Sequence, residues 1–216
     1  MTKHSQWHEE YWLLIMQLYL RKPVGIKPRY SREAIDLCLD LHLSPGLVFE
    51  KMCMLANIET PKMEILWEKF GNNPSRLAKM IKRVRQMNGF NNAEEFYKNV
   101  EINETFEKNF KPIDEEFGQL TPMMLILILN LYFKLTPITM VVETPEIISL
   151  EKLIKVQPEV IVDVMDIFQH CDPYLHRNDI IIHPLLQSCQ NVWTRYGGGS
   201  IDRLDKFAQE LMEYFR

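Results

Sequence analysis

The side chains most able to do chemistry lie in two short stretches, one rich in possible metal ligands and one rich in cations. The first stretch, residues 170–183, combines histidine, cysteine and aspartate, a set that would suit zinc or another divalent transition metal. None of these residues has the close spacing of a CxxC or HExxH motif, and Asp172-Pro173 followed by Asn178-Asp179 is typical of an ordinary turn. We therefore expect a structural loop, and keep a metal-dependent enzyme as the third hypothesis. The candidate ligands are His170, Asp172, His176, Asp179 and His183.

Nucleophilic catalysis has less support than metal binding. Cys171 and Cys189 lie near histidines in the sequence, but a cysteine nucleophile also needs a group that orients its histidine, and the sequence points to none. We therefore name no catalytic residue, expect no cofactor, and favour a protein that is not an enzyme.

The second stretch is a predicted helix over residues 74–87, which carries five cations and no acidic residue. At 100° per residue, its apolar side chains gather on one face and the cations occupy the opposite half. Such a face could follow a phosphate backbone or bind an acidic partner. The commoner explanation is a solvated face that pairs with the Glu-rich segment following it. The cations are Arg76, Lys79, Lys82, Arg83 and Arg85.

The elements that must position these stretches occur twice, across residues 13–87 and again across residues 126–213. Tyr19 and Tyr132 match at an offset of 113 positions. The offset grows to 126 at Trp67 and Trp193 and to 127 in the fifth helices, so the second copy contains an insertion. At the offset of 113, Leu14, Leu18, Glu33, Ile35, Leu37, Pro45 and Met52 also match Leu127, Leu131, Glu146, Ile148, Leu150, Pro158 and Met165. Because diverged copies share mainly what a fold needs, the repeat predicts architecture rather than activity.

Each copy is predicted to form five helices, because helix-start signals recur where the apolar periodicity restarts. Proline follows a capping residue at most of these starts, where its missing N–H costs little. Gly71 and Gly197 end the fourth helices, where glycine suits a left-handed C-cap. The helices are expected at about 6–21, from 32, from 45, 61–70 and 74–87 in the first copy, and at 123–133, from 145, from 158, 184–196 and from 201 in the second.

The predicted fold is therefore all-α: a tandem duplication of a five-helix unit with pseudo-two-fold symmetry, whose halves pack through their first helices. We expect helical repeat A over residues 1–88, an acidic and aromatic connecting segment over 89–121, and helical repeat B over 122–216, in one core or two. A disordered linker would lack the aromatic residues of the connecting segment. We predict that this segment forms one or two short helices held in a groove between the halves.

Two of the five cations recur in the second copy, which predicts a structural role for them, such as ion pairing with the glutamates that begin the second helices. Arg76 and Lys79 match Arg203 and Lys206, and the glutamates are Glu33 and Glu146. The remaining three, Lys82, Arg83 and Arg85, are then the stronger candidates for binding.

A helix-turn-helix spacing occurs over residues 37–48. Reading bases in a major groove needs Arg, Lys, Asn or Gln on the exposed side of the second helix. That helix offers Phe49, Glu50 and Lys51, and its counterpart offers acidic residues at positions 159, 163 and 166. We therefore interpret this segment as a plain helical corner.

The chain of 216 residues is 46% hydrophobic, enough for a buried core, and its formal net charge of −4 argues against a general polyanion binder. Its longest apolar run is too short to span a membrane, which takes about 20 residues. Its first residues show no secretion signal, so we expect a cytoplasmic protein without a membrane partner. The four cysteines lack a CxxC pair and are predicted to be free thiols.

The repeated pattern of Leu-Tyr, Ser/Thr-x-Glu, a proline at a helix start, Trp-x-x-Phe/Tyr-Gly and Arg-Leu-x-Lys resembles a family of uncharacterised, helical bacterial proteins. The resemblance covers most of the chain and implies no activity. We predict a non-catalytic binding or scaffold protein with a protein partner. The alternative is binding of nucleic acid or another polyanion through helix 74–87.

Overall fold

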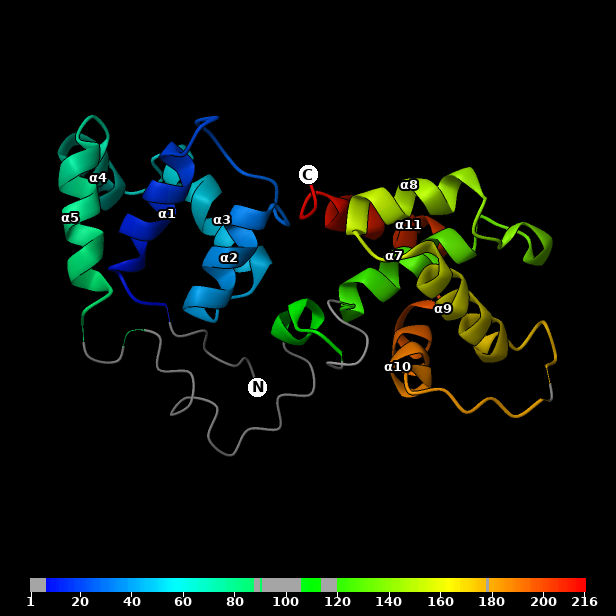
Figure 1. Ribbon diagram of the computed structural model, residues 1–216. Coiled ribbons are helices and arrows are strands. Elements are labelled where there is room, and N and C mark those ends of the chain that lie inside the picture. Colours follow the sequence, from blue (N-terminus) through cyan, green and yellow to red (C-terminus); the bar gives the residue numbers. More distant parts are fainter. Residues whose placement is uncertain (1–6, 88–89, 91–105, 114–119, 178) are drawn as a thin grey trace. The chain divides into compact units, whose positions relative to one another are not determined.

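The computed structural model describes residues 7–87, 90, 106–113, 120–177 and 179–216. These residues form ten α-helices and two short 3-10 helices, with no strand among them, so the all-α prediction is confirmed. The chain divides into two compact units, Met1–Glu104 and Thr105–Arg216, whose helices are drawn in Figure 1. Within the described ranges, no helix is both long and apolar enough to cross a membrane.

Local start signals position the helices of the first unit. The Ser44 side chain accepts a hydrogen bond from the Leu47 backbone N–H (3.3 Å), and Asn73 does the same for Arg76 (3.0 Å). Both caps are followed by a proline that needs no partner for an N–H. The helices are α1 (Tyr11–Leu20), α2 (Arg32–Leu41), α3 (Pro45–Ala56), α4 (Pro61–Phe70) and α5 (Pro74–Val84). Helix α5 thus ends three residues before the predicted Met87.

Helix α1 is the centre of the first unit. It packs against α2, α3 and α5, and Figure 1 shows it between α5 on one side and α2 and α3 on the other. Seven of its ten residues are buried, as expected for a helix that is apolar nearly all round. Tyr19 at its end lies edge-on to Trp67 of α4, with ring centroids 5.5 Å apart. The Trp67 indole N–H donates to the Leu55 carbonyl (2.9 Å), which joins α4 to the end of α3.

Helix α7 has the same central position in the second unit. It packs against α8, α9, α10 and α11 and against the 3-10 helix η1. Nine of its eleven residues are buried, including the polar Asn130. The elements are η1 (Phe106–Phe110), α7 (Pro122–Tyr132), η2 (Pro137–Thr139), α8 (Pro145–Ile154), α9 (Pro158–Cys171), α10 (Leu186–Tyr196) and α11 (Ile201–Met212). Helix α10 begins two residues later than predicted, because Leu185 donates its backbone N–H to the His183 ring (3.1 Å) in a turn.

The prediction that Gly71 and Gly197 are left-handed C-caps is wrong. Their φ angles are −54° and −69°, in the right-handed region that any residue adopts. Glycine is needed for space instead: a Cβ at Gly197 would lie 2.6 Å from Cδ2 of Trp193, and one at Gly71 would lie 2.9 Å from Cε3 of Trp67. The left-handed caps are at the ends of α2 and α8, at His42 (φ 53°) and Lys155 (φ 58°).

Most of the predicted connecting segment lies outside the described residues. Its described part contains η1, which packs on α7. The ring centroids of Phe110 in η1 and of Tyr214 are 5.3 Å apart. Its predicted docking between the halves, and the predicted pseudo-two-fold symmetry, stay predictions.

Candidate functional site

The four cations of α5 and Arg85, which caps its C-terminal end, fall into two groups in the structure. The apolar side of this helix is buried through Leu77, Ile81 and Val84, so the cations face outward as predicted. Arg76 and Arg85 contact their own unit. The Arg76 guanidinium lies 5.5 Å from the Phe70 ring centroid, whereas Arg85 forms an ion pair with Asp40 and lies 5.6 Å from the Phe90 ring centroid.

Lys79, Lys82 and Arg83 form the second group, which we call the basic surface. All three are exposed, and none forms an ion pair with a residue that the structure describes. Their spacing of three and four positions places them on one side of the helix. Arg76 and Lys79 make no ion pair with Glu33, and Arg203 and Lys206 make none with Glu146, within the same ranges. The predicted ion pairing is therefore not observed, and the structural contact of Arg76 is with Phe70 instead.

Two side chains on the second helix of the helix-turn-helix segment contact other residues of the first unit. The Arg29 guanidinium lies 5.4 Å from the Phe49 ring centroid, and the Lys51 ammonium lies over the rings of Trp7 and Trp12. Of the three side chains that would have to read bases, Phe49 and Lys51 are therefore in contact with their own unit, and the exposed Glu50 carries the wrong charge for DNA.

A groove of about 310 Å³ lies between α1, α2 and the C-terminal end of α5 in the first unit. At one end Arg85 closes onto Asp40 through their ion pair. At the other end, the α1 terminus is held by the buried Lys27, whose ammonium donates to the backbone carbonyls of Arg21 (2.7 Å) and Pro23. The lining residues are Leu14, Gln17, Leu18, Arg21, Glu33, Asp36, Leu37, Asp40 and Arg85.

Four polar side chains in this groove have no partner among the described residues. Gln17 on α1 and Arg21 just beyond its end are hydrogen-bond donors, and Glu33 and Asp36 on α2 are carboxylates. Gln17 and Glu33 are half-buried, whereas Arg21 and Asp36 are exposed. Sequence reasoning did not select these four as site residues. The available signal was Gln17, an amide side chain inside an otherwise apolar and aromatic helix.

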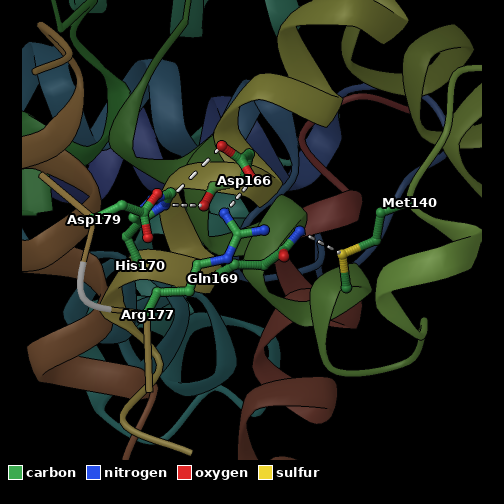
Figure 2. Close-up of polar contacts among 6 residues, drawn as sticks. All are labelled: Met140, Asp166, Gln169, His170, Arg177 and Asp179. Carbon is green, nitrogen blue, oxygen red and sulfur yellow. Dashed lines mark hydrogen bonds and ion pairs between the residues drawn. The ribbon is translucent and has the colours of Figure 1, made fainter. Parts of the chain in front are cut away.

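The structure brings together only two of the five predicted metal ligands. His170 and Asp179 are joined by a 2.8 Å contact between Nε2 and Oδ2, drawn in Figure 2. Asp172 instead accepts a hydrogen bond from the Tyr132 hydroxyl (2.8 Å), and His183 accepts one from the Leu185 backbone N–H. His176 is exposed. No group of three or more potential ligands occurs in the described part of the chain. The contacts of His170 and Asp172 thus join the end of α9 to Asp179 of the following loop and to Tyr132 of α7.

Both ring nitrogens of His170 face acceptors. Nδ1 lies 2.9 Å from the Asp166 carbonyl oxygen and Nε2 faces the Asp179 carboxylate, while Arg177 donates to the Asp166 carboxylate (2.8 Å; Figure 2). A neutral imidazole has one N–H and can donate to only one of these acceptors. The carbonyl contact and then the Asp179 contact therefore raise the pKa of His170, and the same pairing lowers the pKa of Asp179. The His170 imidazolium thus ties α9 to the loop that follows it.

The cysteines are free thiols, as predicted. Burial raises the pKa of Cys38 and of Cys189 to about 12, and that of Cys171 to about 11. The reactive form of cysteine is the thiolate, so these three thiols are poor nucleophiles near neutral pH.

Comparison of the chain with models of protein families, with curated proteins and with solved structures found no match.

Proposed function

We propose that the chain is a non-catalytic helical binding protein and that its basic surface, Lys79, Lys82 and Arg83, binds an acidic protein segment. One observation carries the proposal: these exposed cations lie together on one side of α5 with no counter-charge among the described residues. Arg76 and Arg85, by contrast, contact Phe70 and Asp40. Carboxylates of a partner would supply the missing opposite charge and increase the rate of association.

An acidic protein segment suits this surface better than nucleic acid. Three phosphate contacts give a salt dependence of only about 2.7 in log affinity per log salt, far below that of dedicated DNA-binding proteins. A short run of glutamate or aspartate needs only the local patch.

We also propose that the two units arose by tandem duplication. In support, His42 and Lys155, which end α2 and α8 in the left-handed conformation, lie 113 positions apart, the offset at which the sequence repeats. The aromatic pairs also correspond: Trp67 lies edge-on to Tyr19, and Trp193 to Tyr132.

The duplication makes the basic surface specific to the first unit. Helix α11, the counterpart of α5, keeps the buried Leu204 and Ala208 but carries acidic residues on its outer side. The two copies thus share their buried positions and differ in surface charge, the pattern expected when one copy has acquired a binding role.

The test is the affinity of the full chain for a fluorescent oligoglutamate peptide, compared with single-stranded DNA of equal charge. Reversing Lys79, Lys82 and Arg83 to Glu should weaken peptide binding by about tenfold or more, because three exposed pairs at about 0.5 kcal/mol each contribute roughly 1.5 kcal/mol. The matched control reverses three exposed cations of the second unit, Lys152, Arg203 and Lys206.

The control variant changes the net charge equally and should keep the affinity of the unmodified protein. An equal loss of peptide affinity in both variants would show that only the net charge matters, and would refute the basic surface as the binding site. Tighter binding of DNA than of the peptide would support the nucleic-acid alternative. A rise in affinity on replacing Glu94, Glu95, Glu101 and Glu104 by Gln would instead indicate that the chain's own acidic segment competes for the surface.

A further inference from the structure

The groove between α1, α2 and α5 presents donors on one wall and carboxylates on the other. Gln17 lies on α1 and Arg21, four positions later, is the residue that caps its C-terminal end, and both side chains line the same wall of the groove. Neither side chain meets an acceptor in the described residues, although Glu33 and Asp36 line the same groove. The groove therefore separates opposite charges instead of pairing them.

The second unit shows what such a donor pair can hold. Asn130 and Lys134 are also four positions apart, on α7 and just beyond its end, and both contact the Asp205 carboxylate of α11. The Asn130 amide donates to Oδ1 at 3.1 Å, and the Lys134 ammonium forms an ion pair with the same oxygen. Gln209 donates to the other oxygen (2.8 Å). An amide followed four residues later by a cation thus holds a carboxylate between them.

The first unit has the donors of this arrangement without its carboxylate. Gln17 and Arg21 match Asn130 and Lys134 at the offset of 113, but the residue that matches Asp205 at the offset of 127 is the exposed Ala78 of α5. Helix α5 contains no acidic residue, so it supplies no carboxylate at the corresponding place in the first unit.

The opposite wall selects for a cation on the same ligand. Glu33 and Asp36 lie three positions apart on α2, and the third carboxylate, Asp40, is already paired with Arg85. Leu14, Leu18 and Leu37 add apolar contacts. A volume of about 310 Å³ is at the small end of the range for ligand sites, roughly 300–1,000 Å³. The ligand must therefore be small and carry both charges.

We infer that this groove binds a free amino acid, with its carboxylate held by Gln17 and Arg21 and its ammonium held by Glu33 and Asp36. The ligand class is a small zwitterion whose carbon skeleton lies on the leucines of the groove. This site is separate from the basic surface, so the two proposals can fail independently.

The first experiment measures thermal unfolding and then calorimetric binding of the full chain with each of the twenty amino acids. At least one should raise the unfolding midpoint and bind with one-to-one stoichiometry. Its amide, which lacks the carboxylate, and its N-acetyl form, which lacks the ammonium, should each bind about tenfold more weakly or worse. Absence of binding by all twenty, or equal binding of the blocked forms, would overturn the inference.

The second experiment uses Ala78→Asp, which offers an internal carboxylate to Gln17 and Arg21. This variant should unfold at a higher temperature than the unmodified protein and should bind the amino acid about tenfold more weakly or worse. Ala78→Asn should change both the unfolding temperature and the affinity less than Ala78→Asp does. Arg21→Met should weaken binding similarly. Reversal of Lys79, Lys82 and Arg83 should leave binding unchanged. Unaltered affinity in both Ala78→Asp and Arg21→Met would overturn the carboxylate assignment.

Discussion

Replacing Gly197 by alanine should destabilise the second unit, because the Trp193 ring occupies the space of the new methyl group. The Cβ would lie 2.6, 2.7 and 2.9 Å from Cδ2, Cε2 and Cγ of that ring. The ring is also held from other sides: its centroid lies 5.9 Å from that of Tyr132, 5.6 Å from Phe133 and 6.2 Å from Phe168. The clash can therefore be relieved only by moving a packed aromatic cluster.

The magnitude follows from two opposing effects. Overpacking of this kind costs about 1–3 kcal/mol. Replacing glycine by alanine at a compatible φ, here −69°, returns about 0.4–1 kcal/mol by restricting the unfolded chain. We expect a net loss of about 1–2 kcal/mol in the free energy of unfolding, or roughly 4 °C in the midpoint for each kcal/mol in a unit of this size.

The neighbouring glycine is the matched control. A Cβ at Gly198 would meet no atom within 4 Å, so Gly198→Ala should leave stability unchanged or raise it slightly. Urea unfolding followed by circular dichroism and tryptophan fluorescence would compare the two variants with the unmodified protein. Equal stability of Gly197→Ala and Gly198→Ala would refute the argument that the ring excludes a side chain at Gly197.

Three further predictions concern titration, reactivity and buried polarity. Because the folded-state pKa of His170 is raised, its contribution to stability is complete below about pH 6.5 and is lost as the pH rises through the raised pKa, whereas the contribution of Asp179 is lost only when the pH falls through its lowered pKa. The free energy of unfolding, measured with urea from neutral to mildly alkaline pH, should therefore decline, and His170→Gln should reduce this decline. A decline of the same slope in His170→Gln would contradict the pairing. Cys38 and Cys189 should resist alkylation near pH 8 in the folded protein and react after unfolding in urea, as mass spectrometry of the peptides can measure; rapid labelling of the native protein would count against their burial. Asp205→Ala should lower the free energy of unfolding by about 1–3 kcal/mol because it leaves a buried amide without its acceptor, a loss that denaturant titration can detect.

Most helix starts were predictable because their signals are local, whereas α1, predicted from about residue 6, begins at Tyr11, where Glu10 makes no side-chain cap. Ser44 and Asn73 cap α3 and α5 through backbone N–H groups three residues away, so neither depends on the rest of the fold. The end of α10 was placed correctly for the wrong reason. Glycine at position 197 suggests a left-handed cap, but its actual constraint is the Trp193 ring, whose position depends on contacts with α7 and α9.

The candidate sites were predictable only in part. The cations of α5 were identified from one helix, but Arg85 meets Asp40 of α2 and so leaves the set available for binding. The histidines and aspartates of residues 170–183 are close in sequence yet face different partners, since a loop has no fixed periodicity that aligns its side chains. The groove has no motif, because its walls come from three helices.

By itself, the sequence determined the all-α class, the places where most helices begin, and the apolar faces that those helices bury, because these depend on capping, proline and periodicity within one or a few turns. Only the tertiary structure decided which polar side chains find partners. Gln17 and Asn130 are both amides in apolar central helices, yet of the two only Asn130 has a hydrogen bond to a carboxylate among the described residues, that of a residue 75 positions away. Pairing over such separations depends on how helices pack, and packing depends on the whole core.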